Sequence, residues 1–198
     1  MFAHGVRTCL VAGSCAISLL VTACARLSTV RSDDTVVAHN DGALAAFAVS
    51  GRLSAHHADD AFAAGFHWQH DPRQDVMDFI SPLGQTVAQL QGGEGSVELR
   101  TAKGEVITAD GWSALTRRGL GWPLPVDGLA FWIQGAPRPG GAFTAERDPS
   151  GRLSVLWQDG WTIAYQAFAP DANAAARPSR MTLNYPEVEL RVVIDNWQ

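Results

Sequence analysis

The stretch Val188-Glu-Leu-Arg-Val-Val-Ile-Asp195 lies near the end of the chain and alternates apolar with polar side chains. In an extended strand successive side chains point to opposite faces, so the aliphatic residues of this stretch would share one face and its charged residues the other. The segment Trp161-Thr-Ile-Ala-Tyr-Gln-Ala167 has the same period. Both predict antiparallel strands with one face in the core and one in water.

Short segments of this kind recur along the chain and are separated by turn sequences such as Asp71-Pro72, Ser81-Pro82 and Asp159-Gly160. We therefore expect a mainly β domain of about eleven antiparallel strands. The candidate strands begin near Phe47, Ala61, Asp75, Gln85, Ser96, Glu105, Phe143, Arg152, Trp161, Arg180 and Val188.

Two central segments interrupt this rhythm. Residues Gly111 to Gly121 and Val126 to Gln134 favour short helices, and the second follows Pro123-Leu-Pro125. Two short helices inserted into a long antiparallel sheet predict an open, unclosed barrel. In this architecture the helices form a lid over an apolar cavity.

The first residues have the features of an export signal. An apolar stretch from Leu10 to Ala23 follows Arg7 and is shorter than a membrane-spanning helix requires. It ends in Val21-Thr-Ala-Cys24, the pattern cut by the bacterial lipoprotein signal peptidase. We predict a signal peptide at 1–23, a lipidated Cys24 with a polar tether at 24–43, and one domain at 44–198. An uncleaved signal anchor and processing at Cys15 are the weaker alternatives.

Charge and cysteine content exclude some classes of protein. The formal net charge is −5, whereas a nucleic-acid-binding domain is expected to carry a basic face. All three cysteines precede residue 25, so the exported domain has no disulfide framework and depends on its core. We expect no nucleic-acid partner and no cofactor apart from N-acyl diacylglycerol attached to Cys24.

No motif for catalysis or metal binding stands out. His67 and His70 are three residues apart, which places them on opposite faces of a strand, and we interpret them as solvated strand or turn histidines. No serine lies in a Gly-x-Ser-x-Gly elbow. The sequence leaves open a catalytic pair of acids that come from distant strands, as in glycosidases. We expect neither an enzyme nor a metal site.

Aromatic residues are the remaining signal. The chain contains seven tryptophans, all after residue 60. They suit either a solid core or a wide apolar cavity between sheet and helices.

Several motifs follow one another in the order found in a known family: Phe47-Ala-Val-Ser-Gly-Arg-Leu53, Phe66-His-Trp-Gln-His70, Phe79-Ile-Ser-Pro-Leu-Gly84, Leu120-Gly-Trp-Pro-Leu-Pro125, Trp132-Ile-Gln-Gly-Ala-Pro137 and Ile194-Asp-Asn-Trp197. No single motif is specific, but the ordered set resembles the outer-membrane lipoprotein receptor family LolB over nearly the whole mature chain. Ala25, in place of Asp, is consistent with sorting to the outer membrane.

The resemblance implies a lipid-anchored receptor on the periplasmic face of the outer membrane. Such a receptor accepts acylated lipoproteins from the periplasmic carrier LolA and inserts them among outer-membrane phospholipids. We expect a monomer. The alternative function is a structural or assembly lipoprotein of the envelope that binds a protein partner.

The resemblance also assigns roles to individual residues. Leu83 would protrude from a turn and deliver cargo to the membrane. Six residues are the candidates for the lining of the lipid-binding cavity: Phe66, Trp68, Trp132, Ile133, Trp161 and Tyr165. Their assignment depends on strand register, because a shift of one residue reverses the face.

Overall fold

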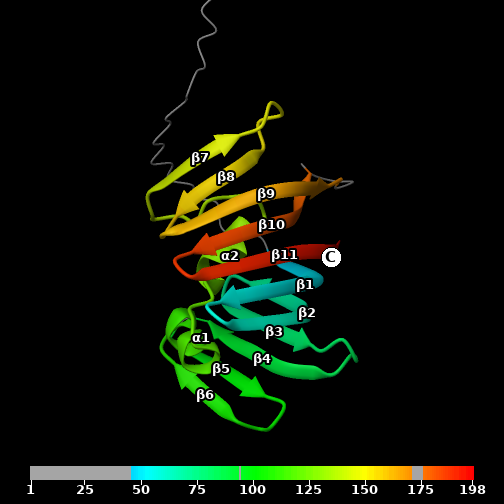
Figure 1. Cartoon of the computed structure of the whole chain (residues 1–198), viewed down its shortest axis with the longest axis vertical. Coiled ribbons are helices and arrows are strands. Elements are labelled where there is room, and N and C mark those ends of the chain that lie inside the picture. Colours follow the sequence, from blue (N-terminus) through cyan, green and yellow to red (C-terminus); the bar gives the residue numbers. More distant parts are fainter. Residues whose placement is uncertain (1–45, 94, 171–175) are drawn as a thin grey trace, which may run out of the picture. The chain divides into compact units, whose positions relative to one another are not determined.

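One continuous antiparallel sheet forms the frame of the domain (Figure 1). The computed structural model describes residues 46–93, 95–170 and 176–198. The first half of the sheet comprises β1 (Phe47–His57), β2 (Asp60–Asp71), β3 (Gln74–Ile80), β4 (Thr86–Gly93), β5 (Ser96–Thr101) and β6 (Val106–Ala109). The second half comprises β7 (Phe143–Arg147), β8 (Leu153–Gln158), β9 (Trp161–Ala169), β10 (Arg177–Tyr185) and β11 (Val188–Trp197).

The strand order is β6-β5-β4-β3-β2-β1-β11-β10-β9-β8-β7. Each half is a meander, and the pairing of β1 with β11 joins the two. Strands β6 and β7 are the free edges, so the sheet is not closed. The predicted fold class, an open antiparallel sheet of eleven strands with two helices, is confirmed.

The two helices lie in the connection between β6 and β7. Helix α1 (Trp112–Leu120) begins after Gly111 and ends at Gly121, whose φ of 85° is left-handed. Helix α2 (Val126–Trp132) is two residues shorter than the sequence predicted. It ends early because the N–H groups of Gln134 and Gly135 turn back to the carbonyls of Phe131 and Trp132, at 3.0 and 2.9 Å.

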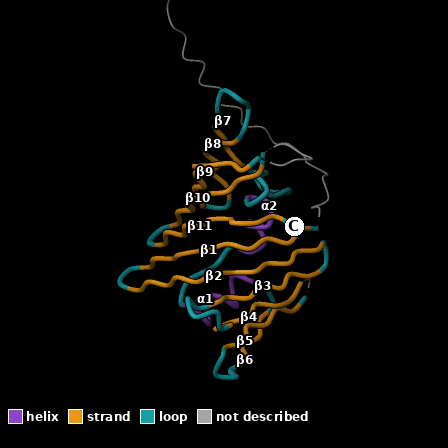
Figure 2. The backbone as a smooth tube through the Cα atoms, turned by 90° about the vertical axis from the view of Figure 1, so that its right-hand side faces the viewer, coloured by secondary structure: helices purple, strands orange, loops and turns teal. Residues whose placement is uncertain are grey.

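The helices cover one face of the sheet (Figure 2). Helix α1 packs on β5 and β6 and also contacts α2. Leu115 of α1 and Trp132 of α2 have no exposed surface. No helix of the described residues is long and apolar enough to cross a membrane.

Alternating burial fixes which strand face lies under the helices. The even-numbered residues of β11 from Val188 to Ile194 are buried, as the sequence predicts. Leu190 pairs with Leu183, Leu183 with Ile163, and Ile163 with Leu156. These four side chains are completely buried and form a row across β11, β10, β9 and β8. Such cross-strand rows stabilise a sheet and fix its register.

Register shifts interrupt the strand ladder on both sides of the central strands. Between Ser50 and Gly51 the pairing of β1 with β11 shifts register. A Cβ on Gly51 would lie 2.1 Å from the carbonyl oxygen of Val193, so only glycine fits there. Strand β10 begins at Arg177 and not near Arg180, and it includes Pro178 at a second irregular position. Proline is tolerated where the ladder is interrupted.

Replacement of Leu183 by alanine should lower the free energy of unfolding by about 2–5 kcal/mol, because the residue is completely buried and would leave a cavity. Leu83→Ala is the matched control, since Leu83 is 87% exposed. Urea titration of a chain that starts at residue 24 with Cys24→Ala, followed by tryptophan fluorescence, measures both. Equal losses for the two variants would contradict the assigned core.

Candidate functional site

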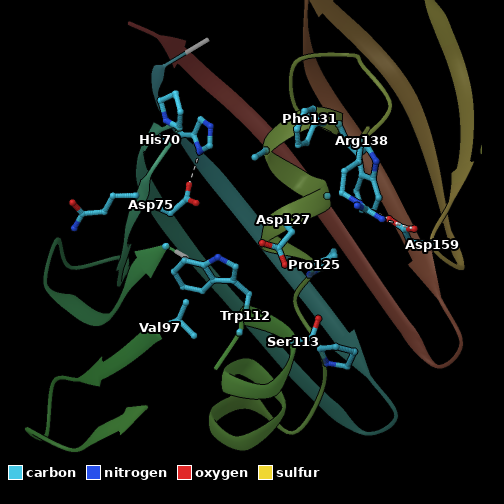
Figure 3. A pocket seen from close by; sticks show the side chains of 18 of the residues that line it. His70, Asp75, Val97, Trp112, Ser113, Pro125, Asp127, Phe131, Arg138 and Asp159 are labelled. Atoms are coloured by element: carbon cyan, nitrogen blue, oxygen red, sulfur yellow. Dashed lines mark hydrogen bonds and ion pairs between the residues drawn. The ribbon is translucent and has the colours of Figure 1, made fainter. Parts of the chain in front are cut away.

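A cleft of about 850 Å³ runs along helices α1 and α2 and is bordered by turns of the sheet (Figure 3). The turn between β2 and β3 forms one side of the cleft, and α1 and α2 form its floor. The opposite side comes from the segment after α2 and from the turns β8–β9 and β10–β11. Its lining includes His70, Asp75, Trp112, Asp127, Arg138 and Trp161.

His70 and Asp75 form a buried pair on the β2–β3 side of the cleft. His70 Nδ1 lies 2.8 Å from Asp75 Oδ1, and Trp68 Nε1 donates to the same oxygen at 2.7 Å. His70 also stacks on Phe47, and only 8% of its surface is exposed. The interpretation of His70 as a solvated histidine is therefore wrong, whereas His67 is exposed as expected. His70 points to the same inward face of β2 as Trp68, because residues two apart in a strand share a face.

Charged groups of opposite sign face each other farther along the cleft. Arg138 makes two hydrogen bonds to the carboxylate of Asp159, at 2.8 and 3.0 Å. Asp127 lies in the first turn of α2 (Figure 3). Partial burial raises the pKa of Asp127, the negative charge of Asp75 raises it further, and Arg138 lowers it. Asp127 is thus an acid whose ionised form is only partly compensated.

Gln158 ties helix α2 to the second half of the sheet. Its Oε1 accepts hydrogen bonds from Trp132 Nε1 at 2.8 Å and from the backbone N–H of Arg138 at 2.7 Å. Its Nε2 donates to the Arg138 carbonyl at 2.7 Å. The Tyr165 hydroxyl donates to the Trp132 carbonyl at 2.9 Å, and burial raises the pKa of this hydroxyl. Two buried hydrogen bonds therefore hold Trp132, the last residue of α2, on β8 and β9, and two partly buried bonds hold the following segment at Arg138.

A second attachment connects the helices to each other. The hydroxyl of Thr116 donates to the Trp112 carbonyl at 2.9 Å and accepts from the Leu124 N–H at 2.8 Å. Thr116 is completely buried. It fixes the turn between α1 and α2, so displacement of one helix affects the other.

Four of the six predicted cavity residues lie on the buried face of β2 and β9, and the other two, Trp132 and Ile133, lie at the end of α2. Each is at most 8% exposed, but only Trp132 and Trp161 line the cleft. Phe66, Trp68, Ile133 and Tyr165 lie among their neighbours in the hydrophobic core. In this conformation the space between sheet and helices is largely occupied by the protein's own side chains. Their role in lipid binding stays a prediction.

The family model described as outer membrane lipoprotein LolB matches residues 45–197. The chain belongs to the LolB family. Its resemblance to that family and its place as an outer-membrane lipoprotein, both expected from the sequence, are thereby confirmed. Cys24 and the proposed signal peptide lie outside the described residues.

Relatives across several bacteria bear the same name. The outer-membrane lipoprotein LolB of Azoarcus sp. is 34% identical over 97% of this chain and 96% of its own. That of Chromobacterium violaceum is 36% identical over 92% and 95%, respectively. Among solved structures, a LolA superfamily protein of Nitrosomonas europaea superposes with a TM-score of 0.49 at 9% identity, covering 78% of this chain and 86% of that one. That structural similarity is too low to assign a fold.

Leu83 of this LolB-family protein protrudes from the turn between β3 and β4. With 87% of its surface exposed, it is the most exposed large hydrophobic residue of the described chain, ahead of Val106 and Trp157. The Gly84 N–H donates to the Ser81 carbonyl at 2.9 Å, and Gly84 has a φ of 81°. This tight turn presents Leu83 outward, as the sequence predicts.

Sequence reasoning missed the cleft residues His70 and Asp127 and also Gln158, which holds the end of α2. His70 could have been placed, because Phe66 and Trp68 set an inward face that includes it. Gln158 follows the buried Leu156 by two residues and could have been placed in the same way. The sequence contains no comparable signal for Asp127, because the packing of α2 determines that this residue faces the cleft. Within the described residues no cluster of three or more potential ligands could hold a metal ion.

Gln158→Leu should lower the free energy of unfolding by about 2–4 kcal/mol, because it leaves two buried N–H donors and a carbonyl unpaired. Gln166→Leu on β9 is the control, since Gln166 is exposed and bonds only Thr182. We expect the control to change stability by less than about 0.5 kcal/mol. Urea unfolding curves measure both, and similar curves for the two variants would show that the hydrogen bonds of Gln158 do not stabilise the fold.

Proposed function

We propose that this chain accepts acylated lipoproteins from the periplasmic carrier LolA and inserts them into the outer membrane. One observation supports the proposal above all others. The inward face of the sheet is apolar from β2 to β9, and within the described residues the helices that cover it are the two short ones, α1 and α2. Displacement of these helices would expose a large apolar surface without breaking the sheet.

The physical need for such a surface comes from the cargo. A triacylated lipoprotein carries three long chains, and each methylene group exposed to water costs about 0.8 kcal/mol. Free passage through the periplasm would therefore cost tens of kcal/mol. An apolar cavity removes most of that cost, so uptake needs no nucleotide and no covalent step. Direction follows from a rising affinity for the acyl chains, from carrier to receptor to bilayer.

In this proposal α2 acts as a lid. The interior is packed when no cargo is bound, and acyl chains replace contacts that Trp132, Ile133 and Tyr165 make with their neighbours. The hydrogen bonds of Gln158 and Tyr165 then define the closed position. A few bonds of this kind, each contributing about 1 kcal/mol, are compatible with opening driven by acyl burial.

Anchoring completes the proposal. Acylation of Cys24 would hold the domain at the periplasmic face of the outer membrane, with residues 24–43 as the tether and 44–198 as the domain. The acyl groups on Cys24 are then the only attached lipid, and the protein acts as a monomer. No catalytic residue is required, because the cargo leaves chemically unchanged.

The packed interior also favours a second candidate function. A structural or assembly lipoprotein that binds a protein partner would have a filled core of this kind and would not take up lipid.

A titration with triacylated lipoprotein separates the two candidates. In the Cys24→Ala chain starting at residue 24, we expect tryptophan emission to change and to saturate at one cargo per chain, because Trp132 and Trp161 line the cleft. The same lipoprotein without acyl groups is the control and should leave the emission unchanged. An identical response to both ligands would favour the protein-binding alternative.

Leu83 has a separate place in the proposed reaction. A leucine that is almost fully exposed on a tight turn can enter the interfacial region of a bilayer, where its burial is favourable. Isolated surface leucines are common, so exposure alone does not establish this role. The family resemblance and the protruding turn together support it.

Leu83→Glu should slow insertion of cargo into liposomes at least several-fold but leave uptake from the carrier unchanged, because a charged side chain is unfavourable in the membrane. Val106→Glu is the matched control, since Val106 is also exposed but begins the edge strand β6. Transfer of fluorescently labelled lipoprotein to liposomes measures the rate. An insertion rate equal to that of the unmodified protein would remove Leu83 from the mechanism.

A further inference from the structure

Three hydrogen-bond acceptors in the cleft have no donor among the described residues. His70 Nε2 is buried without a partner. Asp75 accepts both of its hydrogen bonds at Oδ1, which leaves Oδ2 unused. The Asp127 carboxylate makes no hydrogen bond or ion pair within the described chain, although it lines the same cleft. His70 Nε2 is the buried one of the three, and an unsatisfied buried polar atom is rare in native proteins and calls for a physical reason.

The three groups have matching chemistry. When His70 Nδ1 donates to Asp75, the neutral ring leaves Nε2 as an acceptor. Carboxylates accept only, so the cleft offers acceptors from two sides: the β2–β3 side and helix α2 (Figure 3). Arg138, whose positive charge acts on Asp127, already forms an ion pair with Asp159. A ligand with N–H donors is the complement of such a site.

We propose that His70, Asp75 and Asp127 form a polar subsite that binds backbone N–H groups of the cargo, in the peptide that follows the acylated cysteine. This inference rests on the proposed function and assigns recognition of the peptide portion to residues of the same cleft. The acyl chains themselves carry no donor, so they cannot satisfy these acceptors.

The position of the subsite fits this ligand. Trp132 and Trp161 line the same cleft as the three acceptors and continue into the apolar core. Acyl chains that enter beneath α2 would therefore leave the attached peptide beside Asp127. His70 Nε2 is buried in the closed state, so the groups around it must rearrange before this atom can be used. The subsite would thus favour the open, loaded conformation over the empty one.

Electrostatics point in the same direction. Burial and the charge of Asp75 raise the pKa of Asp127 and Arg138 lowers it, so its ionised form is only partly compensated in the closed state. Hydrogen bonds from ligand N–H groups to a carboxylate provide that compensation and are stronger than bonds between neutral groups.

The test uses the whole lipidated protein in liposomes and two synthetic probes. One probe is a triacylated cysteinyl tetrapeptide. The other has the same acyl chains and sequence but N-methylated backbone amides after the cysteine, which removes the donors alone. Asp127→Ala removes one acceptor from the exposed start of α2. Asp110→Ala is the matched control, because Asp110 is an exposed acid that lines the same cleft near α1.

We expect N-methylation to weaken binding to the unmodified protein about tenfold, the loss expected for hydrogen bonds to a charged acceptor. In the Asp127→Ala protein, N-methylation should have a clearly smaller effect, because one acceptor is already missing. The Asp110→Ala protein should retain the full tenfold difference.

Two results would overturn the inference. Equal binding of both probes to the unmodified protein would show that the amides are not recognised. An undiminished effect of N-methylation in Asp127→Ala would exclude this acid. Failure of the proposed function is distinct, since neither acylated probe would then bind at all.

Discussion

The pairing of β1 with β11 is the constraint on which the rest of the structure depends. It joins residues from the two ends of the described domain, with Val49 opposite Trp197 and, after the register shift at Gly51, a regular ladder to His57 opposite Val188. Without it the two meanders would be separate sheets of six and five strands. Neither meander would then oppose the helices with a continuous apolar face. Because this contact is long-range in sequence, its formation must offset a large loss of chain entropy.

The face created by this pairing carries two kinds of interaction. Most of it consists of aliphatic and aromatic side chains, which pack without directional requirements. A small number of polar groups are placed among them, and Gln158 and Thr116 fix the helices through hydrogen bonds that are specific in geometry. Such a combination allows a defined closed state together with a surface that can accept other apolar groups. It is well suited to a protein of the LolB family whose proposed ligand is itself mainly hydrocarbon.

The fold could be read from the sequence to a large extent, whereas the site could be read only in part. Alternation in β9 and β11 gave the buried face correctly, and the Gly and Pro turns gave strand starts close to those observed. The exception was β10, which begins before Pro178 because an irregularity in the ladder accommodates the proline. The turn at Leu83 was also recognisable, since a Ser-Pro-Leu-Gly sequence has few alternatives. By contrast, His70 was misassigned although it shares the inward face of Phe66 and Trp68, and the stacking on Phe47 that buries it is a tertiary contact.

The sequence by itself determined the strands, the turns, the helical insert and the family, because these depend on local periodicity and on motifs that are contiguous in the chain. Only the tertiary structure decided which polar groups meet. Trp132 and Gln158 are 26 residues apart, and Asp127 and Asp75 approach each other from different elements. Tertiary packing also decided whether the space beneath the helices is hollow or filled. Its outcome depends on how side chains from both halves of the sheet interdigitate, and no single segment encodes that packing.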